Sequence, residues 1–294
     1  MKKFILLMLM FALLLPSCAG NNVTDTSDIS AQTEITNSDD GGSAETDTDT
    51  VIEDVTDGEK ETEAAETEAE IIIPTPEFKA DLSKYEKYMA PTGNERDAYL
   101  ILVNSENKLS SDFVPEGLTD VADTRDDGRK TQQMCLYAEK ALEAFLIEAR
   151  ANGCKNVTVT SAYRDYEYQE KLFNTYIYNE MADDPSLSRD EAEAIVRTYS
   201  AVAGTSEHQT GLACDMHNLS SAKEEFGDTF EGEWLAENAW KFGFILRYAE
   251  DKMEITGGII YEPWHFRYVG RYHATRMHEL DMCLEEYLEY LNNN

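Results

Sequence analysis

Residues 204–215 read Gly-Thr-Ser-Glu-His-Gln-Thr-Gly-Leu-Ala-Cys-Asp, and the expected fold can be worked out from this stretch. Its polar first half ends in a glycine and predicts a loop. Residues 212–216 alternate and predict a short strand that carries Asp215 into a cleft. Further along, residues 259–269 predict a second strand, in which Pro263 requires a bulge or an edge position. We expect these two segments to meet in space.

The two segments carry candidate ligands for one zinc ion. A catalytic zinc takes three protein ligands from His, Asp, Glu or Cys and leaves one position open for water. His208, Asp215 and His265 form such a set. Glu262 is the candidate general base, because a carboxylate beside zinc can take the proton of an acidified water molecule. An irregularity at Pro263 would point Glu262 and His265 toward the same place.

Three blocks of this chain resemble the signature of the VanY-type D-alanyl-D-alanine carboxypeptidases. The matching positions are Ser161-Ala-Tyr-Arg164 followed by Gln169, then Ser206-x-His208-x-x-Gly211-x-Ala213-x-Asp215, and then Glu262-x-Trp264-His265. The resemblance covers roughly residues 98–269. Those enzymes belong to a wider group of zinc peptidases that includes lysostaphin-like enzymes and the hedgehog signalling domain.

The resemblance implies an enzyme that removes the C-terminal D-alanine from peptidoglycan stem peptides during cell-wall remodelling. It implies one zinc, with Glu262 as base and Arg164 as a second catalytic residue. A guanidinium at Arg164 suits a substrate carboxylate or the oxyanion of a tetrahedral intermediate. The substrate-binding positions that it implies are Arg164, Gln169, Ser206 and Ser161.

Other functions remain open at this point. An L,D-carboxypeptidase or a D,D-dipeptidase could use the same fold and ligands. A non-catalytic, zinc-containing domain that binds the cell wall is a further alternative. The carboxylate of Glu262 argues against this last alternative, because a binding domain needs no general base.

The N-terminus predicts export. Two lysines follow Met1, and residues 4–15 form an apolar run that is too short to span a membrane but typical of a signal peptide. Leu15-Pro-Ser-Cys18 resembles a bacterial lipobox, which predicts a signal peptide over residues 1–18 and lipidation of Cys18. Ordinary cleavage without a lipid is the alternative. We expect a protein anchored to the outer face of the cytoplasmic membrane, facing the cell wall.

Residues 19–77 predict a disordered acidic linker, because they are rich in Asp, Glu, Thr and Ser and carry little apolar surface to bury. The whole chain has 58 acidic and 25 basic residues, a formal net charge of -33, which argues against nucleic acid as a partner. The linker would serve as a spacer between the membrane and the enzyme. We expect a monomer whose partner is the stem peptide.

Residues 78–294 are long enough for one folded domain. We expect an α+β fold, with a small, mostly antiparallel sheet, flanking helices, and the zinc site in a cleft on the sheet. The strands expected besides those above are residues 99–103, 157–163 and 244–248. The helices expected are residues 82–88, 131–151, 165–181, 188–203, 230–242 and 272–291.

Four cysteines and three further histidines have no predicted role in the site. Cys135, Cys154, Cys214 and Cys283 have no zinc-finger spacing, and both disulfides and buried thiols are consistent with their positions. Alternation along the strand points Cys214 away from the face of Asp215. We expect His273 and His278 at the surface, and no ligand role for His217.

Overall fold

The computed structural model describes Ile73 and residues 75–294. The predicted signal segment 1–18, the lipidation site Cys18 and the predicted linker up to Ile72 lie outside the described residues. Where the chain is described, no helix has the length and apolar character needed to cross a bilayer.

A four-stranded antiparallel sheet lies at the centre of the fold, in the order β3-β4-β6-β5. Its strands are β3 (Thr158–Ser161), β4 (Ala213–His217), β5 (Phe244–Leu246) and β6 (His265–Tyr268). A separate hairpin pairs β1 (Leu118–Asp120) with β2 (Gln133–Cys135). In the central sheet Asp215 lies opposite His265 on one side and Ser161 on the other. This register brings three distant parts of the chain to one place.

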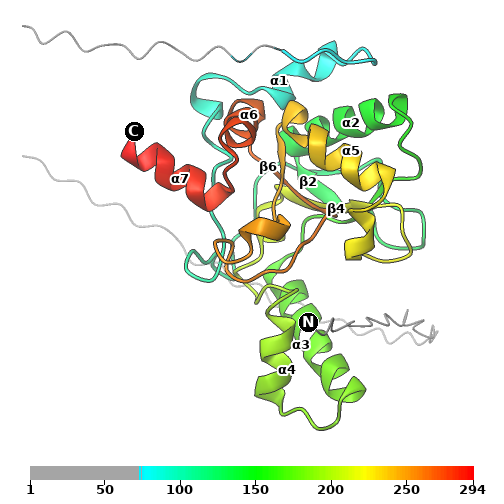
Figure 1. The fold of residues 1–294 in the computed structure, drawn as a ribbon, viewed down its shortest axis with the longest axis vertical. Coiled ribbons are helices and arrows are strands. Elements are labelled where there is room, and N and C mark those ends of the chain that lie inside the picture. The colour runs from blue at the N-terminus through cyan, green and yellow to red at the C-terminus, as the bar shows by residue number, and fades with distance from the viewer. Residues whose placement is uncertain (1–72, 74) are drawn as a thin grey trace, which may run out of the picture. The chain divides into compact units, whose positions relative to one another are not determined.

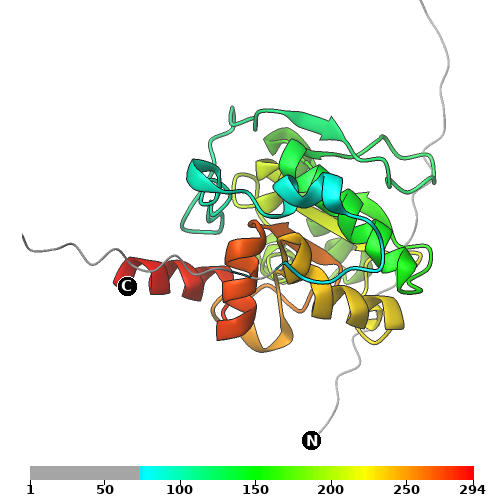
Figure 2. The same cartoon turned by 90° about the horizontal axis from the view of Figure 1, so that it is seen from above.

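Seven α-helices and six short 3-10 helices surround the described sheet strands (Figures 1 and 2). The α-helices are α1 (Glu86–Met89), α2 (Leu136–Ala151), α3 (Tyr166–Asp183), α4 (Arg189–Val196), α5 (Phe230–Asn238), α6 (Arg271–Leu280) and α7 (Leu284–Asn293). The 3-10 helices are η1 (Ser83–Tyr85), η2 (Gly93–Glu95), η3 (Glu207–Thr210), η4 (Glu224–Phe226), η5 (Ala239–Phe242) and η6 (Glu250–Lys252). This mixture of helices and small antiparallel sheets confirms the predicted α+β class.

Helix α2 shares an apolar core cluster with the strands of the central sheet. Its apolar side chains recur at helical spacing and are almost fully buried. Phe145 stacks on Phe242 with ring centroids 4.7 Å apart and meets Phe266 of β6 edge-on at 6.0 Å. The core therefore lies on one side of the sheet and leaves the other face available for polar residues.

Helices α3 and α4 form a hairpin that projects at the lower end of the molecule in Figure 1. The hairpin has a small apolar cluster of its own, which includes Phe173, Ile177, Ala192 and Val196. Asp165 caps α3, and Ser188 and Glu191 form the predicted capping box of α4. The hairpin thus has its own apolar contacts and follows directly after β3.

Several predicted boundaries are wrong, each because tertiary pairing overrides a local pattern. Residues 99–103 are not a strand, since the carbonyls of Tyr99 and Ile101 accept hydrogen bonds from Arg267 at 3.0 and 2.7 Å. The helix predicted over 131–151 begins only at Leu136, because the preceding residues pair with β1. The strand predicted over 259–269 begins only at His265, after Pro263.

Three predicted helices are shorter than expected or divided. The helix predicted for 188–203 ends at Val196, and the one predicted for 230–242 passes from α5 into η5 after Asn238. The helix predicted for 272–291 is two helices, because Asp281 adopts a left-handed conformation (φ 53°, ψ 46°) between α6 and α7. A left-handed residue cannot continue a right-handed helix.

The remaining cysteines and histidines differ in part from expectation. All four cysteines in the described chain are free, and Cys214 is fully buried in the core cluster, on the face opposite Asp215. His278 is exposed and stacks on Trp240. The prediction for His273 is wrong: its ring is 2% exposed, between Asp97 and Tyr287.

Candidate metal centre and active site

Three elements bring the predicted ligands together. His208 lies in η3, Asp215 in the middle of β4, and His265 at the first position of β6. Each of the three side chains offers one ligand atom, and these atoms lie within 4.8 Å of one another. The stretch 207–210, which we expected to be a loop, is a single helical turn that ends at Gly211.

Hydrogen bonds fix the histidine rings of this cluster. The ring of His208 places Nδ1 2.7 Å from the carbonyl oxygen of Ala162, so Nδ1 donates and Nε2 keeps its lone pair. Nε2 lies 3.4 Å from Oδ2 of Asp215 and has no hydrogen-bond partner, although it is buried. His265 presents Nδ1 to Oδ1 of Asp215 at 3.1 Å. The two rings are nearly perpendicular, with centroids 4.9 Å apart.

This arrangement fits a zinc ion. Two imidazole nitrogens and one carboxylate oxygen are a donor set that zinc accepts, and a buried ring nitrogen without a partner is otherwise costly. Burial and the nearby Arg164 lower the pKa of His208 to about 4, so its ring is neutral at pH 7. Burial alone would raise the pKa of Asp215, but His208 and His265 hold it well below its ordinary value. The carboxylate is therefore ionised.

The pKa of His265, unlike that of His208, is raised above its ordinary value. Burial lowers its pKa, but hydrogen bonding to Asp215 and Glu207 and the nearby carboxylates raise it to about 9. A metal ion binds only the deprotonated nitrogen, so binding at His265 releases a proton.

Glu262 lies beside the cluster, in the turn that leads into β6. Its backbone carbonyl accepts from the amide of His265 at 3.0 Å, and its own amide donates to the carbonyl of Tyr248 at 3.1 Å. Oε2 of Glu262 lies 3.7 Å from Nδ1 of His265. Burial raises the pKa of the carboxyl to about 8, against the effect of His265. A carboxylate with a raised pKa next to a metal site is suited to general base catalysis.

Arg164 faces the same cluster from the end of β3. Its Nη2 lies 3.7 Å from Oδ2 of Asp215, and its buried Nε has no hydrogen-bond partner. Nη1 donates to Oε1 of Gln169 at 2.9 Å, while Nε2 of Gln169 donates to the carbonyl of Ala201 at 2.6 Å. Gln169 is 1% exposed and therefore holds Arg164 in place. Its predicted contact with substrate stays a prediction.

The two predicted serines lie near the ligands. Ser161 pairs with Asp215 across the sheet, and Ser206, which is 4% exposed, comes directly before η3. Their contacts with substrate also stay predictions. His217 is not a member of the cluster of candidate ligands.

Sequence reasoning missed four residues that surround the ligands. Glu207, Arg247 and Arg267 are buried and paired behind His265, and Tyr248 packs its ring 5.0 Å from that of His265. One feature could have revealed the pairing: Arg267 lies between the aromatic residues Phe266 and Tyr268 in β6, and an arginine buried in a strand needs a buried acid to compensate its charge.

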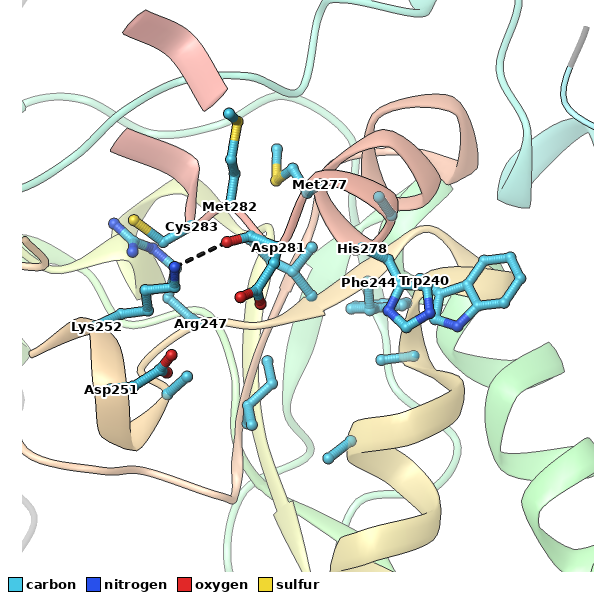
Figure 3. Close-up of a pocket in the computed structure, with 16 residues that line it drawn as sticks. Trp240, Phe244, Arg247, Asp251, Lys252, Met277, His278, Asp281, Met282 and Cys283 are labelled. Carbon is cyan, nitrogen blue, oxygen red and sulfur yellow. Dashed lines mark hydrogen bonds between the residues drawn. The ribbon is translucent and has the colours of Figure 1, made fainter. Parts of the chain in front are cut away.

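A separate pocket lies beside α6, and its lining does not include His208, Asp215 or His265 (Figure 3). It has a volume of about 190 Å³ and is lined by Trp240, Met277, His278 and Met282, among other residues. Lys252 at its edge donates to the carbonyl of Asp281 at 2.8 Å. Arg247 also lines this pocket and turns its guanidinium toward Glu207 and Glu285.

Residues 131–271 match the family model VanY, D-alanyl-D-alanine carboxypeptidase. The D-alanyl-D-alanine carboxypeptidase of Enterococcus faecalis is 37% identical over 196 residues, which cover 67% of this chain and 68% of that enzyme. The chain belongs to the VanY family. The D-alanyl-D-alanine carboxypeptidase of Enterococcus faecium is 35% identical over 65% of this chain, and the match spans 58% of that enzyme.

Solved structures related to VanY have the same fold. A mutant of the D,D-pentapeptidase VanY in complex with Zn(II) has a TM-score of 0.54 and 36% identity, over 65% of this chain and 98% of that one. VanYB in complex with D-alanine-D-alanine has a TM-score of 0.56 at the same identity and coverage. The LD-carboxypeptidase LdcB has a TM-score of 0.57 and 34% identity, over 67% of this chain and 88% of that one.

Proposed function

We propose that this protein is a zinc-dependent D-alanyl-D-alanine carboxypeptidase that removes the C-terminal D-alanine from peptidoglycan stem peptides. The observation that carries the proposal is the cluster of the buried His208 and His265 with the partly buried Asp215, with Glu262 and Arg164 beside it. The Zn(II) in the similar VanY structure and the D-alanine-D-alanine in the similar VanYB structure support this choice of metal and substrate.

Each side chain of the site has a separate role in the proposed reaction. Zinc held by His208, Asp215 and His265 would polarise the scissile carbonyl and acidify a water molecule. Glu262 accepts a proton from the attacking water and passes it to the leaving amine of D-alanine. Arg164, whose Nη2 lies 3.7 Å from Oδ2 of Asp215, can bind the carboxylate of the substrate or the negative charge that develops on the carbonyl oxygen.

The first experiment measures zinc content and product together. The purified protein should contain one zinc per chain and release D-alanine from a pentapeptide. Chelation should abolish the release, and zinc should restore it. A protein that binds zinc but releases no product from any stem peptide would instead be a wall-binding domain.

L,D-carboxypeptidase activity is the second candidate, because LdcB shares this fold at comparable similarity. The two activities act on different bonds and so give different products. Incubation with tetrapeptide, pentapeptide and free D-alanyl-D-alanine should show cleavage of the pentapeptide. Cleavage of the tetrapeptide alone would identify an L,D-carboxypeptidase, and cleavage of the free dipeptide alone would identify a dipeptidase.

We also propose that the enzyme works as an exported monomer that is attached to the membrane through a lipid on Cys18. The apolar run 4–15 and the sequence Leu15-Pro-Ser-Cys18 support export and lipidation. Wild-type protein should incorporate labelled fatty acid and sediment with membranes, and Cys18→Ala should do neither. Equal labelling of the two proteins would contradict the anchor.

A further inference from the structure

A buried network of charges lies directly behind His265. The carboxylate of Glu207 is fully enclosed, and its Oε1 accepts two hydrogen bonds of 2.8 Å, one from Nε of Arg247 and one from Nη1 of Arg267. Arg247 uses its other two nitrogens to bind both oxygens of Glu285 in α7, at 2.9 and 2.6 Å. A buried carboxylate is costly unless cations and hydrogen bonds compensate it, and here both are present.

The second oxygen of Glu207 points at the metal centre. Oε2 lies 3.5 Å from Nε2 of His265, and neither atom has another hydrogen-bond partner. Buried polar atoms are nearly always paired. A small approach of these two side chains satisfies both atoms at once, with the ring donating and the carboxylate accepting.

We propose that Glu207 is a positioning residue that holds the proton of His265 on Nε2 and thereby leaves the lone pair of Nδ1 facing Asp215 and the metal. The proposal rests on the proposed function only in taking the bound ion to be zinc. A carboxylate behind a metal-binding histidine is a known way to fix its tautomer and raise its basicity.

The two arginines explain why Glu207 can act in this way. Arg247 and Arg267 each donate to Oε1 at 2.8 Å, and these two ion pairs compensate the buried negative charge and keep the carboxylate ionised. An ionised carboxylate can only accept a hydrogen bond, so the shared proton must come from the ring. The arginines also occupy Oε1, which leaves Oε2 for His265.

The experiment compares two substitutions in the same network. Glu207→Gln removes the charged acceptor behind His265, whereas Glu285→Gln removes the other acid bound to Arg247 without touching the ring. Zinc affinity of the full chain is measured by competition with a chromophoric chelator. We expect Glu207→Gln to weaken zinc binding about 10–100-fold, the range found for such supporting residues, and Glu285→Gln to leave it nearly unchanged. Equal affinity in wild type and folded Glu207→Gln would overturn the proposal.

A second measurement needs no variant and covers the case in which Glu207→Gln fails to fold. The chain has five histidines, so nitrogen-15 NMR of the zinc-bound wild type can assign each ring. His265 should carry its proton on Nε2, in slow exchange with solvent. A proton on Nδ1, or zinc on Nε2, would contradict the proposal. Absence of zinc binding in the wild type would instead contradict the proposed function, so the two failures are distinguishable.

Discussion

Two carboxylates at the metal centre, Asp215 and Glu262, differ in their affinity for protons. Burial raises the pKa of Asp215, but its contacts with His208 and His265 lower it well below its ordinary value and keep the carboxylate ionised. Burial has the largest effect on the pKa of Glu262 and raises it to about 8. Pairs of acids whose surroundings separate their pKa values commonly have separate roles. The structure therefore gives Asp215 the properties of a ligand and Glu262 those of a base.

Substitutions of Glu262 and His208 should separate metal binding from catalysis. Glu262→Gln keeps the size of the side chain but cannot accept a proton, so it should bind one zinc and lose turnover by about 10²–10⁴-fold or more. His208→Ala should lose zinc together with activity. Metal analysis beside release of D-alanine tests both. Loss of zinc in Glu262→Gln would make Glu262 a ligand.

The planar guanidinium group of Arg164 should be required for full activity, and a positive charge alone should not replace it. Lysine keeps the charge but loses the planar fork that reaches Gln169 and the site, so Arg164→Lys should lower kcat/KM by more than about tenfold in a folded protein. The matched control is Arg197→Lys on the exposed side of α4, which should leave kcat/KM unchanged. Wild-type kinetics in Arg164→Lys would remove this residue from the catalytic machinery.

Among the elements, the junction between η3 and β4 determines where His208 and Asp215 lie relative to each other. Gly211 makes the turn with φ 69°, and its amide donates to the carbonyl of His208 at 3.2 Å. A Cβ at this position would lie 2.9 Å from Sγ of Cys135 and 3.1 Å from Leu118. The glycine is thus required both by its conformation and by its neighbours.

Gly117 provides a matched control for Gly211, because its φ is 68° and a Cβ at this position would meet no atom within 4 Å. Gly117→Ala should cost only the strain of a left-handed residue, about 1–2 kcal/mol. Gly211→Ala should cost clearly more and should also weaken zinc binding, because the displaced turn carries His208. Denaturant unfolding and chelator competition measure the two effects. Equal losses of stability in both variants would contradict the packing argument.

Local patterns predicted some of these elements and could not predict others. Alternation located β4 and placed Cys214 and Asp215 on opposite faces, because one face of this strand is buried in the core. The helix break at Asp281 could not be predicted, since no Gly or Pro stands there. The three candidate ligands follow from their motif. The network of Glu207, Arg247 and Arg267 does not, because only the folded sheet brings these residues together.

Over the whole described domain, the segment before β1 wraps around the core and is held by polar contacts to distant residues. Glu148 of α2 accepts from the amides of Lys79 and Ala80, both at 2.8 Å. His273 of α6 contacts Asp97 through Nε2 at 2.9 Å and Tyr287 of α7 through Nδ1 at 3.0 Å. This histidine therefore connects the early segment with both C-terminal helices.

The pH dependence of stability should report on this connection. Burial lowers the pKa of His273 below its ordinary value of 6.5 and outweighs the attraction of Asp97, whose exposed side chain is screened by solvent. The unfolded chain therefore binds a proton more readily than the native protein. The stability that His273 contributes is complete above about pH 6.5 and is lost as the pH falls below it.

The comparison of wild type with His273→Gln isolates this contribution from other groups. The difference in free energy of unfolding between the two proteins should shrink between pH 7.5 and pH 5, as measured by denaturant titration. Arg96 and Asp97 are the charged groups that face the ring, and both keep their charge over this range. A difference that stays constant with pH would show that the ring does not titrate in this way.

The order β3-β4-β6-β5 has a consequence for the rates of folding and unfolding. Asp215 and His265 are 50 residues apart in sequence, and β5 lies between their strands along the chain. The metal centre is complete only after this long-range pairing, which is a slow step in folding. A ligand that binds only the finished centre should leave the refolding rate nearly unchanged and slow the unfolding rate. Stopped-flow measurements with and without zinc should therefore show a slower unfolding rate and nearly the same refolding rate. Zinc would then extend the lifetime of the folded enzyme without accelerating its folding.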